Sequence, residues 1–190
     1  MVFEYLEYDL TGVLETPEIR LNQDHIKSWS QQLLSGVHYM HTNRIIHRDL
    51  KASNLLINRK GELKIADLGL ARSWNPEMKR LTNKVITLWY RPPELLLGTH
   101  VYSPKIDMWS VGCIVAEMFR RAAFLKGSSD ASQLDLIFRT MGHHSLGMVY
   151  HSTQYRGVEP HVFALGSYLY NSAVGGDAIT GKQLYNIPND

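Results

Sequence analysis

The sequence predicts a mainly α-helical fold with short β-hairpins. Three long segments place hydrophobic residues at three- and four-residue steps, and two short apolar runs are joined by a polar turn that contains glycine. The 190 residues are 44% hydrophobic and 20% charged, which is typical of a globular protein with a substantial core. This length fits one domain, or one domain with an appendage.

The first predicted elements are a strand and a helix. The chain opens on the mostly apolar run Val2–Leu6, which we predict to be a buried strand. Asp24–Thr42 is predicted to form an amphipathic helix, with Asn22 or Asp24 as its N-cap. Its apolar face is expected to pack against the core.

The middle of the chain predicts a hairpin and two further helices. Residues 55–57 and 63–65 are short strands joined by a turn at residues 58–61, so the residues before and after the hairpin lie side by side at one edge. A helix over residues 103–121 is apolar around most of its circumference and is therefore expected at the centre of the core. Residues 124–141 are predicted to form the last helix.

A change of composition near Gly142 predicts a domain boundary. Only five Asp, Glu, Lys or Arg residues lie in residues 143–190, which are rich in glycine and tyrosine. We therefore expect residues 1–142 to form one unit and residues 143–190 a divergent tail of uncertain fold.

Charge and cysteine content exclude several classes of protein. A net charge of +2 gives no indication of nucleic-acid or membrane binding, and the apolar runs are too short and too often interrupted by charge for a transmembrane helix. The only cysteine, Cys113, excludes an internal disulfide and lies in an apolar run, where a buried thiol is expected. No signal peptide is recognisable at the start. An intracellular protein is the expectation.

Two polar motifs carry the chemistry. His47–Asn54 and Ala66–Gly69 flank the predicted hairpin, which brings the first loop next to Asp67. Any one of these polar residues alone would be unremarkable in a surface loop. Together they provide a carboxylate, Asp49, that can accept a hydrogen bond and later the proton of a substrate hydroxyl, and an ammonium, Lys51, that can lie near a transferred phosphate.

The remaining side chains of these motifs predict a metal site. Asn54 and Asp67 supply the hard oxygen ligands that Mg²⁺ prefers. The joint pattern therefore predicts phosphoryl transfer from a magnesium nucleotide.

The pattern His-Arg-Asp-Leu-Lys-x-x-Asn followed by Asp-x-Gly resembles the catalytic and magnesium-binding loops in the C-terminal lobe of eukaryotic protein kinases. Lys51 is the serine/threonine-kinase form of the loop, and Leu68 replaces the phenylalanine that most kinases carry. The resemblance implies a protein-kinase large lobe with the N-terminal lobe absent, because no Gly-x-Gly-x-x-Gly occurs in the sequence. We therefore expect negligible kinase activity from the chain alone.

The run Thr87–Gly98 resembles the end of the activation segment in cyclin-dependent kinases, and Glu4–Gly12 points to their transcription-associated branch. The resemblance implies transfer of the γ-phosphate of ATP to a Ser or Thr that precedes proline. It also implies a cyclin partner in the full-length family, although the kinase helix that docks the cyclin is absent here. The expected location is the nucleus or the cytoplasm, and the nucleus is indicated by the resemblance alone.

The same resemblance assigns further residues. Asp107 would hold the catalytic loop through its backbone. Thr82 would be an activation-loop phosphorylation site paired by Arg48 and Arg72, although an unmodified surface threonine is the alternative. The substrate-binding residues would be Val85, Thr87 and Arg91. The ATP-binding residues would be Phe3 beside the adenine, Glu4 and Leu6 at its edge, Asp9 at the ribose, and Leu56 and Ala66 beneath the base.

A second class of function stays open at this point. The chain could be a non-catalytic kinase-lobe module that docks substrates or partners through residues 85–91, or a fragment from a fused or wrongly assembled gene. His38, His41 and His100 show no ligand spacing, and surface or capping roles are expected for them.

Overall fold

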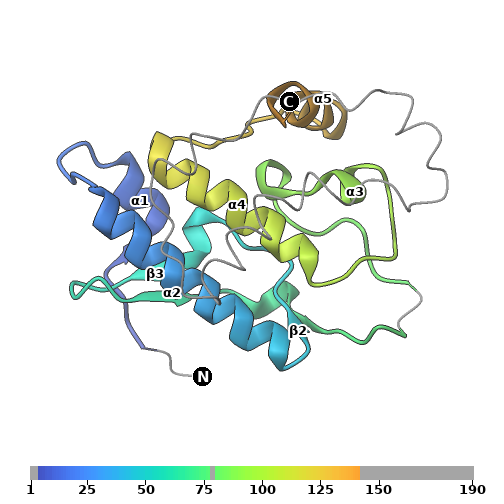
Figure 1. Cartoon of the computed structure of the whole chain (residues 1–190), viewed down its shortest axis with the longest axis horizontal. Helices are drawn as coiled ribbons and strands as arrows, with labels where there is room; N and C mark the ends of the chain where they lie inside the picture. Colours follow the sequence, from blue (N-terminus) through green and yellow to red (C-terminus); the bar gives the residue numbers. More distant parts are fainter. Residues whose placement is uncertain (1–3, 78–79, 142–190) are drawn as a thin grey trace.

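The computed structural model describes residues 4–77 and 80–141. Within them the protein consists mostly of helices, with short antiparallel strands at one side (Figure 1). The elements in chain order are β1 (Tyr8–Asp9), α1 (Leu10–Glu15), α2 (Gln23–Thr42), β2 (Ile45–Ile46), η1 (Ala52–Asn54), β3 (Leu55–Ile57), β4 (Leu63–Ile65), η2 (Leu68–Leu70), β5 (Arg72–Ser73), η3 (Leu88–Tyr90), α3 (Pro93–Leu96), α4 (Lys105–Arg120) and α5 (Asp130–Met141).

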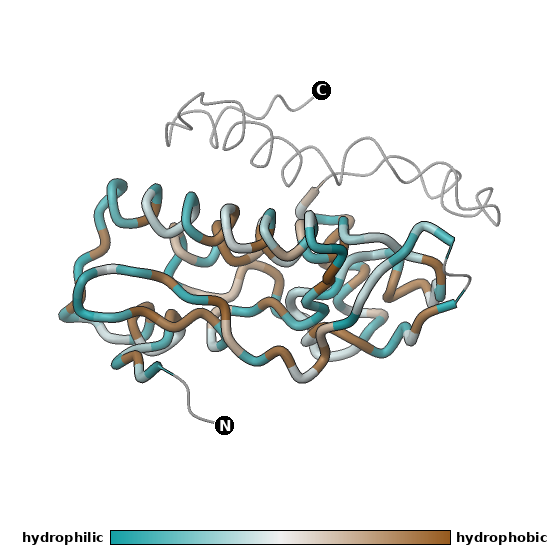
Figure 2. Tube along the Cα trace, turned by 90° about the horizontal axis from the view of Figure 1, so that it is seen from below, coloured by the Kyte–Doolittle hydropathy of each residue, from teal (hydrophilic) through white to brown (hydrophobic). Residues whose placement is uncertain are grey.

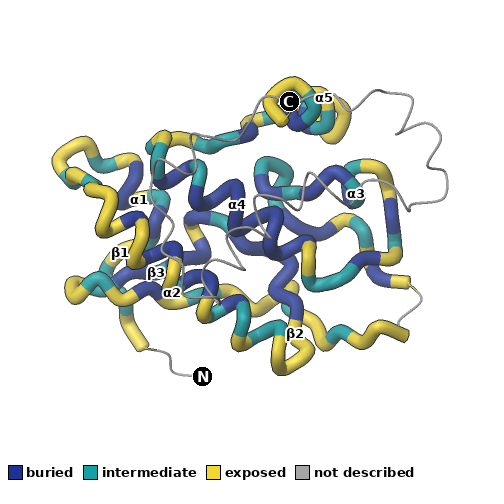
Figure 3. Tube along the Cα trace, in the orientation of Figure 1, coloured by how far each residue is buried: buried dark blue, intermediate teal, exposed yellow. Residues whose placement is uncertain are grey.

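The two long helices α2 and α4 pack against each other at the centre (Figure 1). The prediction that the second of them is central is confirmed, since most of α4 is buried along its length (Figure 3). Of the two predicted caps of α2, Asn22 is the one used: its Oδ1 accepts the backbone N–H of His25 at 2.9 Å. The His25 ring accepts the N–H of Asn22 in return at 3.3 Å, which closes a capping box.

The strands form two small antiparallel sheets, with the orders β1-β3-β4 and β2-β5. The predicted hairpin is confirmed, with Leu55 opposite Ile65 and Ile57 opposite Leu63. Its turn closes because Asn58 Oδ1 accepts two backbone N–H groups and Gly61 takes φ +79°, which glycine adopts without strain. Helix α2 packs on β4, so the hairpin is fixed to the core.

The expected opening strand is wrong for residues 4–6. These residues form no strand, and Tyr5 is 82% exposed. Strand pairing starts only at Tyr8, opposite Ile57. Residues 4–6 pair with no described strand, so the apolar run does not become a strand there. Residues 2 and 3 of that prediction lie outside the described residues.

The last helix begins at Asp130, later than predicted. The N–H of Gly127 is taken by the Gln133 side chain at 2.8 Å, and the N–H groups of Ser128 and Ser129 are taken by the Ser132 hydroxyl at 2.9 and 2.8 Å. Side chains of the helix thus bond to the residues ahead of it, so that these residues cap the helix instead of continuing it.

Hydrophobic residues gather in the interior of the trace and hydrophilic residues on its outer turns (Figure 2). Cys113 is buried in α4, as predicted, and burial raises the pKa of its thiol. Among the described residues, no helix combines the length and the hydropathy needed to span a bilayer. The predicted tail, residues 143–190, lies outside the described part of the chain.

Candidate active site

A buried carboxylate on α4 holds the loop that follows β2. Asp107 is fully buried; its Oδ2 accepts the backbone N–H of His47 at 2.9 Å, and its Oδ1 accepts that of Arg48 at 2.9 Å. His41, from the end of α2, bonds to the same Oδ2 at 2.8 Å. The surface or capping role expected for His41 is therefore wrong, because its ring faces this buried carboxylate.

The loop held in this way has unusual backbone geometry. Arg48 has φ +65°, a left-handed conformation that is uncommon for residues other than glycine. Its carbonyl accepts the N–H of Ile86 at 3.0 Å, and Ile86 has φ +68°. Asp67 has φ +60° as well. Such conformations persist where the surrounding structure enforces them, and they concentrate at functional sites.

The carboxylate of Asp49 is the centre of the site. Its Oδ1 accepts the Thr87 hydroxyl at 2.9 Å and the Thr87 backbone N–H at 3.1 Å. Its Oδ2 forms an ion pair with the Lys51 ammonium at 2.8 Å. Three residues predicted for catalysis and substrate binding are therefore in direct contact, although 36 positions separate Lys51 from Thr87.

Asp49 is held in its charged form. Burial raises the pKa of its carboxyl, but the hydrogen bonds from Lys51 and Thr87 outweigh burial and lower the pKa below its usual value. A carboxylate with a low pKa is a weak base. It can therefore orient a hydroxyl by accepting a hydrogen bond and take the proton only late in a reaction.

Asn54 and Asp67 each keep an oxygen available. The Asn54 amide nitrogen donates to the Asp49 carbonyl at 2.9 Å, which turns the amide oxygen away from Asp49, and no described residue donates to that oxygen. The Asp67 side chain is exposed, and its Oδ1 accepts the N–H of Gly69 at 3.2 Å.

The β3–β4 hairpin brings Asn54 and Asp67 together. The N–H of Ala66 donates to the carbonyl of Asn54 at 2.8 Å, one residue before Asp67. Amide and carboxylate oxygens of this kind fit a hard cation such as Mg²⁺. Within residues 4–77 and 80–141, no group of three or more His, Cys, Asp or Glu side chains is placed to hold a metal ion. Leu68, at the edge of the site, is 61% exposed.

Two predicted nucleotide-binding residues are neighbours in a sheet. Asp9 lies opposite Leu56 in the pairing of β1 with β3. Asp9 is also the N-cap of α1, since its Oδ1 accepts the N–H of Gly12 at 3.0 Å. Leu56 is partly exposed, between the fully buried Leu55 and the buried Ile57.

Two further predicted nucleotide residues, Glu4 and Leu6, precede β1 in the chain. Glu4 is exposed and pairs with Lys64 of β4 at 3.5 Å, while Leu6 is half-buried. Phe3 lies outside the described residues. Glu4 thus lies beside the sheet formed by β1, β3 and β4.

The predicted phosphorylation segment is tied to the catalytic loop through a tyrosine. Thr82 is exposed, and its carbonyl accepts the hydroxyl of Tyr102 at 2.6 Å. Arg48 donates to the oxygen of the same hydroxyl at 3.3 Å. Arg72 is exposed on β5, the strand that pairs with the strand leading into Arg48. Nothing in the sequence marked Tyr102 as the link.

Arg91 holds the backbone of residues 85–91, the predicted substrate segment. Its Nε donates to the carbonyls of Val85 and Ile86, each at 3.1 Å, and its Nη2 donates to Ile86 at 2.9 Å. The side chain of Val85 is buried, and its role in substrate binding stays a prediction. Arg91 Nη1 reaches Asp130 at the start of α5, at 2.9 Å.

The far end of this segment is anchored on α4. The Tyr90 hydroxyl donates to Glu117 at 2.7 Å, and the Ser110 hydroxyl donates to the Tyr90 carbonyl at 2.9 Å. Burial raises the pKa of both Tyr90 and Glu117. These contacts fix η3 against the core. Sequence reasoning missed them, since their partners lie 20 and 27 positions apart with no shared motif.

Comparison with known proteins identifies the family. The protein kinase domain family matches residues 1–159. Cyclin-dependent kinase C-1 of Arabidopsis thaliana is 54% identical over 143 residues, which are 75% of this chain and 28% of that protein. Cyclin-dependent kinase 12 of Caenorhabditis elegans is 53% identical over 143 residues, which are 75% of this chain and 20% of that protein. The chain thus spans less than a third of the length of either relative.

A solved structure gives the same result. The crystal structure of the yeast RNA Pol II CTD kinase CTDK-1 complex contains a chain that superposes with a TM-score of 0.75 at 44% identity, covering 80% of this chain and 51% of that one. The chain therefore belongs to the protein kinase family. Within that family, its sequence falls with the transcription-associated branch of the cyclin-dependent kinases.

Proposed function

We propose that this chain carries the catalytic segment of a serine/threonine protein kinase, which moves the γ-phosphate of Mg-ATP to a Ser or Thr hydroxyl. The observation that carries the proposal is the Asp49 carboxylate, held charged between Lys51 and Thr87. Asp49 would orient the substrate hydroxyl and accept its proton, and Lys51 would neutralise charge on the transferred phosphate.

Asn54 and Asp67 are the proposed magnesium ligands, because each keeps an oxygen that no described residue donates to. When bound, Mg²⁺ supplies positive charge against the phosphates of the nucleotide. The proposed nucleotide contacts are residues in or near the sheet formed by β1, β3 and β4, together with Phe3: Glu4, Leu6, Asp9, Leu56 and Ala66.

A substrate with proline after the acceptor hydroxyl fits the segment around Arg91. Both carbonyls that a substrate N–H would seek there, those of Val85 and Ile86, already accept hydrogen bonds from the Arg91 guanidinium. A residue with a backbone N–H would bury it without a partner, which costs about 1–3 kcal/mol. Proline has no N–H and avoids that cost.

The wider assignments rest on family membership. We propose that residues 1–142 form the hinge and C-terminal lobe of the kinase domain, with residues 143–190 a separate tail. By likeness to the cyclin-dependent kinases, we propose a cyclin partner and regulation at Thr82 through Arg48 and Arg72. By likeness to the yeast RNA Pol II CTD kinase, we propose a nuclear substrate of the transcription machinery. A non-catalytic module that docks partners through residues 85–91 is the alternative.

Transfer of labelled phosphate from Mg-ATP to a Ser-Pro peptide tests the reaction. We expect the transfer that the chain supports, at whatever rate, to fall by about 100-fold or more in Asp49→Asn, because the amide cannot accept the hydroxyl proton. Asp135→Asn, on the exposed face of α5, is the matched control. Transfer that is as fast in Asp49→Asn as in the control would contradict the proposed role of Asp49.

A further inference from the structure

The Arg91 guanidinium is shared between the substrate segment and α5. Its Nε and Nη2 hold the carbonyls of Val85 and Ile86, while its Nη1 forms an ion pair with the Asp130 carboxylate at 2.9 Å. The Arg91 side chain is 19% exposed and that of Asp130 is 63% exposed. The pair therefore lies at the rim of the segment, where Asp130 anchors the outer edge of the guanidinium.

Asp130 is held in place by the residues that surround the start of its helix. Gln133, one turn along the same helix, is fully buried and donates to the Leu125 carbonyl at 3.2 Å, while its amide oxygen accepts the Gly127 N–H at 2.8 Å. The Trp89 indole N–H donates to the Gly127 carbonyl at 3.0 Å, which ties this corner to η3. Because the backbone around Asp130 is fixed, the ion pair requires little further ordering of α5.

Arg91 needs such an anchor because it stabilises a strained backbone. Ile86, a β-branched residue, has φ +68°, which its side chain disfavours. The guanidinium is planar and directs its donors in fixed directions. Fixing Nη1 on Asp130 therefore leaves Nε and Nη2 directed at the two carbonyls.

We propose that Asp130 is a positioning residue for substrate specificity, which keeps Arg91 on the carbonyls of Val85 and Ile86 and so maintains the preference for proline. The inference rests on the proposed proline preference and adds a residue that the substrate need not touch. Without the carboxylate, Arg91 turns towards solvent for part of the time. The freed carbonyls then accept the N–H of a residue other than proline.

The test compares two peptides that differ only in Ser-Pro and Ser-Ala. Their affinities for the 190-residue chain are measured by NMR titration in the presence of Mg²⁺ and a non-hydrolysable ATP analogue, so that no turnover is required. We expect the Pro/Ala affinity ratio to fall roughly three- to fivefold in Asp130→Ala and Asp130→Asn, mainly through tighter binding of the Ala peptide, which is the size of effect expected for one partly exposed ion pair. Asp130→Glu is expected to retain most of the ratio.

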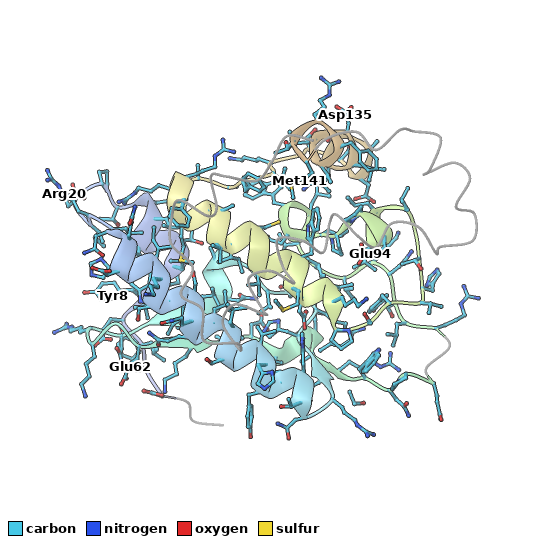
Figure 4. The ribbon with its side chains drawn as sticks, in the orientation of Figure 1. Tyr8, Arg20, Glu62, Glu94, Asp135 and Met141 are labelled. Carbon is cyan, nitrogen blue, oxygen red and sulfur yellow. The ribbon has the colours of Figure 1, made fainter. Side chains whose placement is uncertain are left out.

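Asp135→Asn is the matched control. Asp135 lies on the outer side of α5 (Figure 4) and pairs with Arg139 at 2.8 Å, with side chains that are 59% and 72% exposed, so its loss should leave the ratio unchanged. If the Asp130 variants weaken both peptides equally, or keep the wild-type ratio, the inference fails while the proposed function stands. If the wild-type chain shows no preference for the Ser-Pro peptide, the proposed proline preference itself fails.

Discussion

Replacing Asp107 with alanine is expected to lower the free energy of unfolding by about 3–5 kcal/mol and to release the catalytic loop. The carboxylate is fully buried and accepts the backbone N–H groups of His47 and Arg48, and its Oδ2 also bonds to the His41 ring. Alanine leaves two buried N–H groups without acceptors, at about 1–3 kcal/mol each, and adds a cavity. Urea denaturation measures the loss.

Asp107→Asn removes the charge of this side chain but keeps its shape. Asparagine keeps one acceptor but turns an amide N–H towards a backbone N–H, so we expect it to lose less than alanine and still more than 1 kcal/mol. Asp135→Ala, in an exposed pair on α5, is expected to change stability by less than about 0.5 kcal/mol. An Asp107→Ala variant as stable as Asp135→Ala would contradict the role given to this carboxylate.

Replacing Arg91 with alanine is expected to have the next largest effect, about 2–4 kcal/mol, concentrated in residues 81–91. Val85 and Ile86 are both buried, and their carbonyls would lose the donors that Arg91 supplies. Each orphaned group costs about 1–3 kcal/mol, and Ile86 would no longer be held in its left-handed conformation. Amide hydrogen exchange should show faster exchange across these residues than elsewhere.

Arg139→Ala is the matched control for this prediction. Arg139 is an arginine of similar chemistry, but it pairs with Asp135 on the exposed face of α5 and contacts no carbonyl of the substrate segment in the described structure. Equal exchange rates in residues 81–91 for the two variants would show that Arg91 does not hold the segment.

The regular elements were predictable because local patterns determine them. The residues from Asn22 to Thr42 contain both the cap and the apolar spacing of α2, and the hairpin is framed by the turn at Asn58 and Gly61. The short helices α1 and α3 were not predicted. The first spans only Leu10–Glu15 and contains Gly12, a residue of low helix propensity, and the second spans only Pro93–Leu96, so both are too short to show a period.

The contacts that complete the site were harder to predict, because they join residues far apart in the chain. His41 and Asp107 are 66 positions apart, and Arg91 and Asp130 are 39 apart, with no shared motif to connect them. The left-handed backbone at Arg48 and Ile86 also has no local signal, since neither residue type favours it. Packing around the loops imposes that geometry.

Binding of Mg-ATP tests the central claim most directly, because the claim places a magnesium nucleotide at Asn54 and Asp67, beside Asp49. With Mg-ATP at ten times its Kd, the melting temperature of the chain should rise by roughly 3–6 °C. The rise should disappear when EDTA removes the metal and in Asp67→Asn, while the surface variant Asp135→Asn should keep it in full. No rise at millimolar Mg-ATP, or an unchanged rise in Asp67→Asn, would contradict the claim and favour a module that docks partners without catalysis.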